Sequence, residues 1–495
     1  MLEVILKGHD KYYGVSDVVR MFAGVPEELK DEGKVIAPEG PDITLINELL
    51  PDGRSITYFD GKEYEFKGAL LEPGREIKRS LYMALSGITK KDMPWGCLTG
   101  IRPTLVACEE ESAKDLEDKY FVRPDKAALA FETSREEQRI LSKVPEDSLN
   151  IYVGIPFCPS RCEYCSFVSS DISCHMDRLV NYGKALEREI ELIAKRINRP
   201  VASLYVGGGT PTVFEEREFA SLLDCIYSNL KISSDAEVTV EAGRPDTITD
   251  GKLEAMREHG ITRICINPQT MRTETLLRLG RKHTAEDTVR VYSKACEMGF
   301  DLINMDLIAG LPYENAEEHV ESTKNLIKLA PANITIHTLY KKRRAAMSRD
   351  TVMDKEKTRD TLDECVAESY RLLMEAGYHP YYMYRQKDTG HGLENTGFAK
   401  GDTGSLYNVA MMSDCRDVLS FGAGGMSKRC FAQEGELYKH RVERCPTIKD
   451  ALYGVIPSHA VIAEWSSCKE TCNSEEYGIA CRPETKDVHM THHHQ

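Results

Sequence analysis

Residues 154–167 read GIPFCPSRCEYCSF, a loop punctuated by glycine and proline that holds three cysteines, Cys158, Cys162 and Cys165. Three thiols at the spacing C-x3-C-x2-C predict a soft-metal site, because thiolates bind zinc and iron–sulfur clusters. A structural zinc needs a fourth ligand, which Cys174 or His175 could supply. A [4Fe–4S] cluster held by only three thiolates would keep one iron open for an exogenous ligand. The loop alone leaves both alternatives open.

A repetitive pattern of short apolar runs and amphipathic stretches surrounds this loop from residue 150 onward. The runs are NIYVGIPF (150–157), VASLYVGGG (201–209), AEVTVEAG (236–243), ITRICINPQ (261–269), FDLINMDLIAGLP (300–312) and ANITIHTLY (332–340). Stretches with helical periodicity, such as 178–197 and 317–330, lie between them. Six strands with interleaved helices predict an α/β fold, a partial (β/α)6 TIM-like barrel with right-handed crossovers. In such barrels the active site lies at the carboxyl ends of the strands.

Polar or glycine-rich signals fall at the ends of these runs. They are Gly207-Gly208-Gly209-Thr210 after the second run, Glu241 after the third, Gln269 after the fourth, and Asp306 within the fifth. Each has an ordinary structural explanation when taken singly, as a tight turn, a cap or a salt-bridge partner. Glycines at a strand end also let a ligand approach the backbone. Four such signals in order, after the cysteine loop, indicate one functional site.

These motifs together resemble a known family. YVGIPFCPSRCEYC, GGGTPT, VEAG, INPQT, LGRKHT and MDLIAGLP are similar to the radical S-adenosylmethionine (SAM) enzymes of the oxygen-independent coproporphyrinogen III oxidase group, over roughly residues 90–440. WGCLTGIRPT, YRQKDTGHGLENTGFA and SFGAGGMSKR most resemble the HemZ-type coproporphyrinogen dehydrogenases within it. The resemblance implies that Cys158, Cys162 and Cys165 hold a [4Fe–4S] cluster whose open iron binds SAM. One electron would then cleave SAM to methionine and a 5′-deoxyadenosyl radical.

The resemblance also implies roles for single residues. Tyr152 and Glu241 are the expected catalytic residues, both contacting the SAM at the cluster. The other expected cofactor-binding residues are Tyr164, Gly208, Gly209, Thr210, Gln269, Arg281, Asp306, Thr338 and Met426. Gln269, Arg281 and Asp306 match positions that contact a second SAM in the oxidase branch. That branch has a further cysteine where this chain reads Cys165-Ser166-Phe167, and a histidine within VGIPF, so one or two SAM molecules remain possible readings.

The substrate that the resemblance implies is a tetrapyrrole, coproporphyrinogen III, whose propionates become vinyl groups to give protoporphyrinogen IX without oxygen. Its pocket should combine basic side chains with apolar or aromatic walls. Candidates are Lys341, Lys342, Arg343 and Arg344 in YKKRRAA, and Tyr381, Tyr382, Tyr384 and Arg385 in YYMYRQK. Three other functions stay open: a radical SAM haem chaperone, whose branch usually reads Cys-Asp-Phe after the cluster, a haem-modifying methyltransferase, and a zinc-held binding module.

The chain is divided into four regions. Residues 1–148 form an N-terminal α+β domain of unassigned role, with a strand at LEVILKG, a hairpin around Asp60-Gly61 and a helix at EIKRSLYMALSGIT. Residues 149–350 form the barrel, and residues 351–445 a HemN-like C-terminal accessory region. Residues 446–495 are expected to be a divergent, poorly ordered tail. Its Cys468, Cys472 and Cys481 are weak evidence for a metal site.

Composition sets the remaining expectations. The 495 residues carry a formal net charge of −15, which argues against broad binding of nucleic acid or anionic membranes. Neither a run of 18 apolar residues nor a signal peptide appears, so we expect a cytoplasmic protein without a membrane span. Sixteen scattered cysteines then indicate thiols plus one metal site rather than disulfides. We also expect the protein to be a monomer and to receive electrons from a donor such as flavodoxin or ferredoxin.

Overall fold

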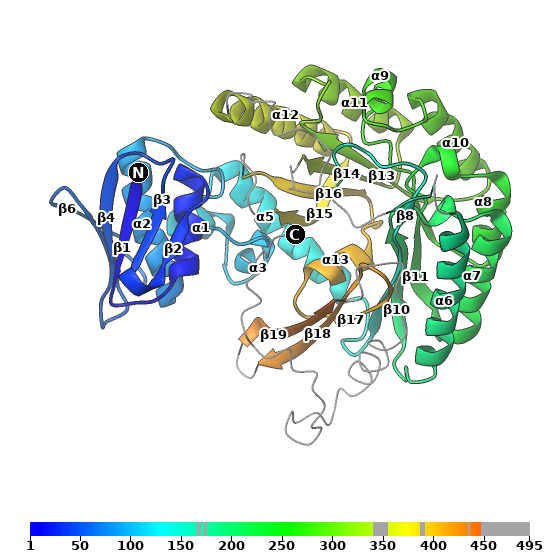
Figure 1. The fold of residues 1–495 in the computed structure, drawn as a ribbon, viewed down its shortest axis with the longest axis horizontal. Helices are drawn as coiled ribbons and strands as arrows, with labels where there is room; N and C mark the ends of the chain where they lie inside the picture. The colour runs from blue at the N-terminus through cyan, green and yellow to red at the C-terminus, as the bar shows by residue number, and fades with distance from the viewer. Residues whose placement is uncertain (166–169, 173–175, 340–354, 387–391, 434–435, 447–495) are drawn as a thin grey trace.

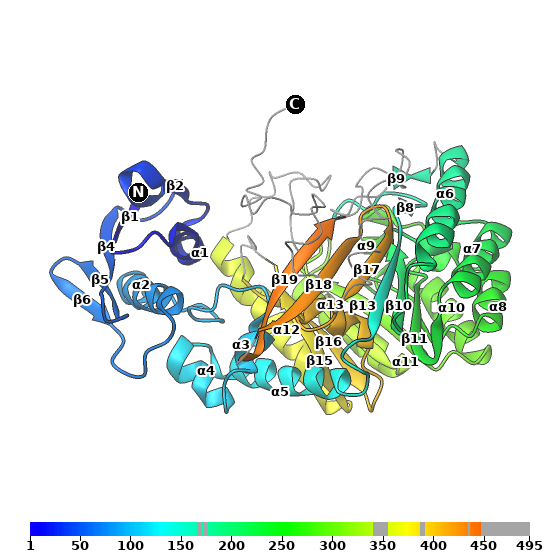
Figure 2. The ribbon, with the colours of Figure 1, turned by 90° about the horizontal axis from the view of Figure 1, so that it is seen from below.

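The computed structural model describes residues 1–165, 170–172, 176–339, 355–386, 392–433 and 436–446. Within these ranges the strands form a six-stranded sheet, an eleven-stranded sheet and a short two-stranded pair. The six-stranded sheet lies at one end of the molecule and the larger sheet forms the body at the other end (Figures 1 and 2). No helix in the described residues is long and apolar enough to cross a membrane.

The larger sheet has the strand order β15-β16-β14-β13-β12-β11-β10-β7-β17-β18-β19. Its six central strands are parallel and follow one another along the chain: β7 Leu149–Ile155, β10 Val201–Gly208, β11 Ile232–Glu241, β12 Arg263–Cys265, β13 Leu302–Ala309 and β14 Asn333–Thr338. The helices between them lie on the outer side (Figure 1): α6 Met176–Ala194, α7 Glu216–Asn229, α8 Asp250–Glu258, α9 Thr273–Arg278, α10 Ala285–Glu297 and α11 Ala316–Leu329. The predicted partial (β/α)6 barrel is confirmed.

Alternation along the strands explains which side chains enter the barrel. Ile151 and Val153 of β7, and Leu204 and Val206 of β10, are completely buried on the side that faces the helices. The positions between them face inward, and the parallel register aligns them across the sheet. Tyr152 pairs with Tyr205, Tyr205 with Thr239, and Thr239 with Arg263, while one layer nearer the carboxyl ends Glu241 pairs with Cys265. The interior is therefore built from polar and aromatic layers.

Local signals begin the outer helices. The α10 helix begins at a capping box of Thr284 with Asp287, and α11 at one of Asn315 with Glu318. In each box the first side chain accepts a hydrogen bond from the backbone N–H of the second residue, and the second side chain accepts one from the backbone N–H of the first. Both bonds satisfy donors that have no partner within the helix.

The C-terminal strands extend the barrel sheet at both edges rather than forming a separate sheet. At the β14 edge, β16 Glu394–Lys400 and β15 Tyr378–Arg385 run antiparallel. At the β7 edge lie β17 Val418–Gly422, β18 Met426–Gln433 and β19 Glu436–Pro446. The helix α12 Lys355–Glu375 packs against α11. The helix α13 Leu406–Met412 contacts α5 Pro124–Leu141 between the two edges. The barrel is thus partial, and α13 lies in the gap between its two edges.

The N-terminal sheet has the order β2-β3-β1-β4-β5-β6. Its elements are β1 Leu2–Lys7, α1 Tyr12–Ala23, β2 Glu27–Leu29, β3 Lys34–Ala37, β4 Ile43–Leu49, β5 Ser55–Phe59, β6 Lys62–Glu65 and α2 Pro73–Thr89. The predicted strand, hairpin and helix are all present. Asp60 and Gly61 join β5 to β6 with φ values of 48° and 74°, the two positive values that a two-residue type I′ turn requires.

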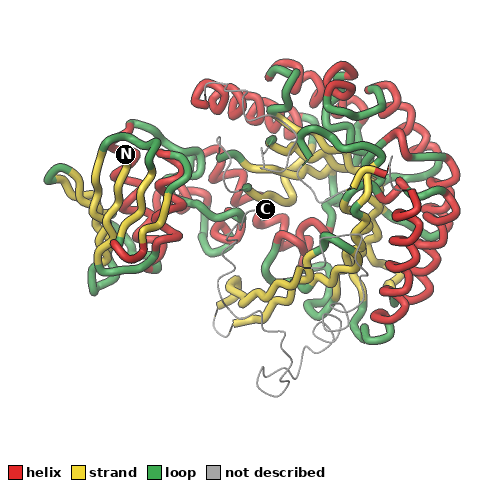
Figure 3. Tube along the Cα trace, viewed as in Figure 1, coloured by secondary structure: helices red, strands yellow, loops and turns green. Residues whose placement is uncertain are grey.

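The segment that follows α2 docks onto the barrel sheet. It contains α3 Pro103–Ala107, α4 Ala113–Tyr120 and α5 Pro124–Leu141, and α5 packs against β15. Figures 1 and 3, drawn from the same side, show α3 and the start of α5 between the six-stranded sheet and the barrel. Trp95 Nε1 donates to Glu394 Oε2 at 3.0 Å, and Lys126 Nζ donates to Glu394 Oε1 at 2.6 Å. Ile140 of α5 packs in one apolar cluster with Val409 of α13. The domain boundaries at 148, 350 and 445 stay predictions.

Candidate active site

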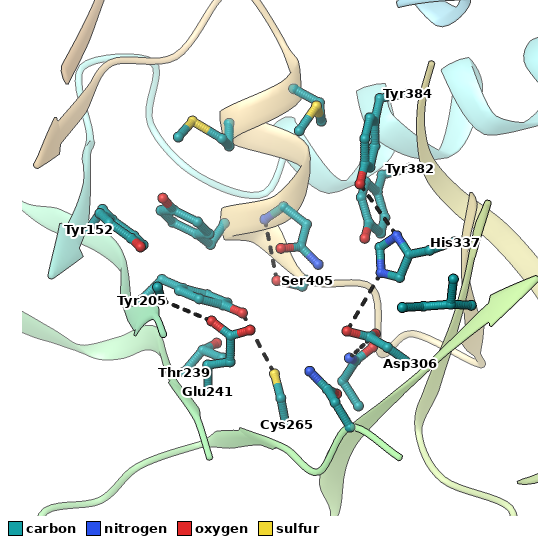
Figure 4. Close-up of a pocket in the computed structure, with 18 of the residues that line it drawn as sticks. Tyr152, Tyr205, Thr239, Glu241, Cys265, Asp306, His337, Tyr382, Tyr384 and Ser405 are labelled. Carbon is teal, nitrogen blue, oxygen red and sulfur yellow. Dashed lines mark hydrogen bonds and ion pairs between the residues drawn. The ribbon is translucent and has the colours of Figure 1, made fainter. Parts of the chain in front are cut away.

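A cavity of about 640 Å³ lies inside the barrel, toward the carboxyl ends of its strands. It is lined by side chains of the barrel strands, of α13 and of the loop that connects β17 to β18. The structure brings the following predicted site residues together on its walls: Tyr152, Tyr164, Cys165, Gly208, Glu241, Gln269, Asp306, Thr338 and Met426. Figure 4 shows two facing walls, with Tyr152, Tyr205 and Glu241 on one and Asp306, His337 and Tyr384 on the other.

The glycine segment at the end of β10 approaches the cysteine loop closely. Gly208 has φ of +114°, and Gly209 N donates to Ile155 O at 2.7 Å. A Cβ on Gly209 would lie 2.3 Å from Phe157 O, so a larger residue would push the loop away. Thr210 N donates to Phe157 O at 2.7 Å, and its Oγ1 lies 3.6 Å from Cys158 Sγ. Gly209 and Thr210 therefore contact the loop rather than the cavity.

Glu241 ends β11 inside the cavity. Its Oε2 accepts a hydrogen bond from Gly208 N at 3.1 Å. Burial raises the pKa of the carboxyl to about 7, although the Gly208 bond opposes the rise. Near neutral pH the group is therefore divided between its two protonation states, and a cationic ligand beside it would favour the carboxylate.

Three stacked tyrosines form the wall around Tyr152, and two of them were not predicted from the sequence. The ring centroid of Tyr152 lies 6.2 Å from that of Tyr205 and 6.2 Å from that of Tyr407. The ring centroids of Tyr205 and Tyr407 lie 4.7 Å apart. The signal for Tyr205 was available, because it occupies the position of β10 that alternation places inside the barrel. Tyr407 comes from α13, about 250 residues further along the chain than Tyr152, so no local pattern indicates it.

The opposite wall carries a contact between a histidine ring and a carboxylate. His337 Nε2 lies 3.6 Å from Asp306 Oδ2, and Tyr384 Oη lies 3.3 Å from His337 Nδ1. Asn304 Nδ2 donates to Asp306 Oδ1 at 2.8 Å. Burial raises the pKa of Asp306, but the bonds with His337 and Asn304 outweigh burial and hold the pKa below its ordinary value. His337 was also missed, although it too is an inward position of its strand.

Gln269 and Thr338 are fixed on this wall through backbone contacts. Gln269, with φ of 73°, donates its N–H to Asp306 O and accepts from Ile308 N, both at 2.9 Å. Thr338 N donates to Asn395 Oδ1 at 2.9 Å. The left-handed backbone of Gln269 is unusual for a residue with a Cβ, and two hydrogen bonds to β13 hold it in place.

The cysteine loop lies beside the cavity, with Cys165 on its wall. Cys162 is buried, and two guanidinium groups approach its sulfur: Arg244 Nη1 at 3.6 Å and Arg281 Nη1 at 4.0 Å. Arg281 also donates to Tyr164 Oη at 3.2 Å and to two backbone carbonyls. Arg281 thus contacts the loop and is not among the residues that line the cavity, and its role as a SAM contact stays a prediction.

This environment suits thiolates. The Thr210 hydroxyl lies 3.6 Å from Cys158 Sγ and the Arg244 guanidinium 3.6 Å from Cys162 Sγ, and hydrogen bonds to sulfur are common around iron–sulfur clusters. Among the described residues no three His, Cys, Asp or Glu side chains converge to hold a single metal ion. A four-iron cluster binds each thiolate through a different iron, so its ligands need not converge on one ion. The three cysteines fit a cluster.

The predicted substrate contacts have mixed outcomes. Tyr381, Tyr382 and Tyr384 line the cavity, whereas Arg385 does not. The Arg385 guanidinium donates to Leu98 O at 2.5 Å and lies over the Trp95 ring at 5.4 Å, so it contacts the docked N-terminal segment instead. Several residues named from the sequence lie outside the described residues: Ser166, Phe167, Cys174, His175, Lys341, Lys342, Arg343, Arg344, Cys468, Cys472 and Cys481.

Residues 152–326 match the family model of the radical SAM superfamily. The chain is 36% identical over 370 residues to the oxygen-independent coproporphyrinogen-III oxidase-like protein HemZ of Bacillus subtilis, which covers 70% of this chain and 72% of the relative. It is 31% identical over 279 residues to the heme chaperone HemW of the same organism, covering 55% and 69%. The solved coproporphyrinogen III oxidase (HemN) of Escherichia coli aligns with a TM-score of 0.49 at 23% identity, over 64% of this chain and 70% of that one.

The cysteine loop, the glycine segment and the barrel thus occur in a chain that is 36% identical to HemZ over an alignment covering 70% of this chain and 72% of HemZ. The protein belongs to the radical SAM superfamily and, within it, to the HemN/HemZ group.

Proposed function

We propose that the protein oxidatively decarboxylates propionate side chains of coproporphyrinogen III, giving the vinyl groups of protoporphyrinogen IX without oxygen. One observation carries the proposal: Cys165, the Gly208 segment and Glu241 meet on one cavity at the carboxyl ends of the barrel strands, in a member of the HemN/HemZ group. Membership of the superfamily implies a [4Fe–4S] cluster and SAM as cofactors.

Cys158, Cys162 and Cys165 are the proposed cluster ligands. With SAM bound, such a cluster would supply the electron needed to form a 5′-deoxyadenosyl radical, which would remove a hydrogen atom from substrate. A one-electron donor such as flavodoxin or ferredoxin is part of this proposal, and so is a one-electron acceptor for the electron released when the propionate loses carbon dioxide. The residues of the chain hold the reactants in place and exclude water from a reactive intermediate.

Tyr152, Gly208 and Glu241 form the proposed SAM wall. Gly208 presents backbone without a side chain, so a ligand can approach closely. Glu241 carries its charge next to where a cationic sulfonium ligand would lie, and its raised pKa lets it release a proton as that ligand binds. Gln269, Asp306, Thr338 and Met426 on the remaining walls are proposed ligand contacts, whether the cavity holds one SAM or two.

The substrate is proposed to lie against the aromatic side of the cavity. Tyr382, Tyr384 and Tyr407 offer flat apolar faces for a macrocycle, and Met411 and Met412 of α13 add adaptable apolar contacts. His337 is a candidate partner for a propionate, because it lines the cavity beside Tyr384 and its ring nitrogens are polar groups on the aromatic side.

The test is an anaerobic assay of the reconstituted protein with SAM, a chemical reductant and coproporphyrinogen III. Mass spectrometry should detect tripropionate and dipropionate products together with 5′-deoxyadenosine, and the ratio of 5′-deoxyadenosine to carbon dioxide reports the SAM used per decarboxylation. A Cys162→Ser variant is the control and should form neither product.

A second candidate is a haem chaperone, favoured by the 31% identity to HemW. Stable haem binding without decarboxylation of coproporphyrinogen III would favour this function. The two candidates are separated by one experiment, because the chaperone predicts a haem absorbance that survives gel filtration and no tripropionate product.

A further inference from the structure

Arg244 lies behind the cysteine loop, outside the cavity, and the proposed reaction does not use it. It belongs to the turn between β11 and α8 and is only 3% exposed. Its Nη1 lies 3.6 Å from Cys162 Sγ, and its Nη2 lies 3.1 Å from Ser160 Oγ. One guanidinium therefore contacts both a proposed cluster ligand and the loop that carries it.

Asp246 fixes this guanidinium. Its two carboxylate oxygens accept from Arg244 Nε at 3.0 Å and from Nη2 at 3.2 Å. This leaves Nη1 for the cysteine loop, where it lies 3.6 Å from Cys162 Sγ and 3.5 Å from Ser160 O. His283 Nδ1, 1% exposed, lies 3.4 Å from Asp246 Oδ1. A bidentate arginine–carboxylate pair is directional, so the position of Nη1 is set by contacts other than its own bond to sulfur.

Arg281 is a weaker candidate for the same role. Its Nη1 is farther from the sulfur, at 4.0 Å, and bonds to Tyr164 Oη, while its Nη2 bonds to the carbonyls of Gly243 and Asn267. Arg281 thus braces backbone around the loop. Arg244 has an anion that orients it, and its remaining nitrogen contacts the Cys162 sulfur and the Ser160 carbonyl of the loop.

Hydrogen bonds to cluster sulfurs and nearby charges help set the reduction potential of an iron–sulfur cluster. A fixed cation at a ligand sulfur stabilises the reduced, more negative state more than the oxidised state. We propose that Arg244, oriented by Asp246, is a positioning residue that binds the sulfur of Cys162 and raises the reduction potential of the cluster. The inference rests on the proposed cluster ligands and not on the identity of the tetrapyrrole.

The experiment compares the wild type with Arg244→Gln, Arg244→Lys and Asp246→Asn after anaerobic reconstitution. Each cluster is reduced at a series of fixed potentials, and the electron paramagnetic resonance signal of the reduced cluster is measured. At one fixed potential R244Q should show about a tenfold lower ratio of reduced to oxidised cluster, which corresponds to about 59 mV for a one-electron couple. R244K keeps the charge and should recover part of this ratio.

D246N makes the test two-sided. It removes an anion but leaves a side chain that still accepts from Arg244, so its cluster should be reduced more easily than that of the wild type. A purely structural role for Arg244 predicts loss of iron and no such opposite shift. Arg257→Gln is the matched control, because this α8 arginine donates to Gly299 O and lies over Phe300.

The outcomes separate this inference from the proposed function. An R244Q protein with full iron content and an unchanged potential overturns the inference, even if the enzyme is active. If R244Q holds no cluster, D246N decides, and an unchanged or lower potential in that variant overturns the inference. A wild-type cluster with the expected shifts but no decarboxylation overturns the proposed function and leaves the role of Arg244 supported.

Discussion

The carboxylate of Glu241 accepts the backbone N–H of Gly208 at 3.1 Å, which joins the end of β11 to the glycine segment at the end of β10. The same glycine segment contacts the loop of the cysteines through Gly209 and Thr210. A single short path of contacts therefore links the acidic group of the cavity to the proposed cluster ligands. A substitution at either end of this path should therefore alter the contacts at the other end.

Glu241→Gln should remove a pH dependence. Burial raises the pKa of Glu241 to about 7, so the acid form is favoured in the folded protein and the stability this gives is lost as pH rises from about 4.5 to 7. The melting temperature of E241Q relative to the wild type should therefore increase between pH 5 and pH 8. Wild-type affinity for SAM should rise with pH through 7, whereas that of E241Q should stay low and flat. Equal pH profiles in calorimetry and SAM titration would contradict the assignment.

Gly209→Ala should displace the cysteine loop. The added Cβ would lie 2.3 Å from Phe157 O, a backbone atom that cannot move alone, so overpacking should cost about 1–3 kcal/mol of unfolding free energy. We expect iron content after reconstitution to fall well below that of the wild type. Gly74→Ala in α2 is the control, because its Cβ meets nothing within 4 Å. A G209A protein with full iron content and unchanged stability would show that the approach is not tight.

The barrel could be predicted from sequence because its information is local. Alternation within each run identifies a strand, and parallel strands bring their carboxyl ends together, so Glu241 and Asp306 were expected on one site before any contact was known. Tyr205 and His337 follow from the same alternation once strand register is known. Both residues lie at inward positions below the strand ends, whereas the polar and glycine signals of the sequence fall at the strand ends themselves.

Contacts between distant segments could not be predicted in this way. Tyr407 reaches the cavity because α13 fills the gap between the two edges of the open barrel. This placement depends on tertiary packing and not on the sequence pattern of any single strand or helix. Arg385 follows a tyrosine-rich stretch, and this pattern predicts a substrate contact. Its guanidinium instead contacts Leu98 O and the Trp95 ring in the docked N-terminal segment. The sequence around Arg385 does not show which residues of the fold will bury its guanidinium. Burial lowers the pKa of Arg385 to about 10.

Tyr407→Ala should weaken the aromatic wall, whereas Tyr407→Phe should preserve it. Tyr407 is 5% exposed and stacks on Tyr205 at 4.7 Å, so removing the ring should cost about 3–5 kcal/mol, as large-to-small changes of aromatic residues do. Within the described residues its hydroxyl has no hydrogen-bond partner, so the phenylalanine variant should lose no stability. Urea denaturation of both variants measures the difference. Equal losses would mean that the hydroxyl, not the ring, supports the wall.

Lys126→Met should destabilise the contact between the N-terminal segment and the barrel. Lys126 Nζ and Glu394 Oε1 are 2.6 Å apart, and both side chains are almost fully buried. Removal of one partner leaves a buried charge, which costs about 3–5 kcal/mol. The double variant Lys126→Met with Glu394→Gln should regain part of that loss, because its remaining group is neutral and still accepts from Trp95. Denaturation midpoints that rank the double variant below the single one would contradict this account.

Cys265→Ser should leave the cluster intact although Cys265 lines the cavity together with Cys165. Burial raises the pKa of Cys265 well above its ordinary value, and the nearby charges of Glu241 and Asp306 raise it further, so the group stays a protonated thiol and a poor iron ligand. Cys165→Ser, by contrast, should lose the iron–sulfur absorbance, since Cys165 belongs to the loop whose sulfurs face cationic and hydroxyl donors. Iron and sulfide analysis of both variants after reconstitution separates them. A loss of iron in C265S equal to that in C165S would assign Cys265 to the cluster and would remove the open coordination position on which SAM binding depends.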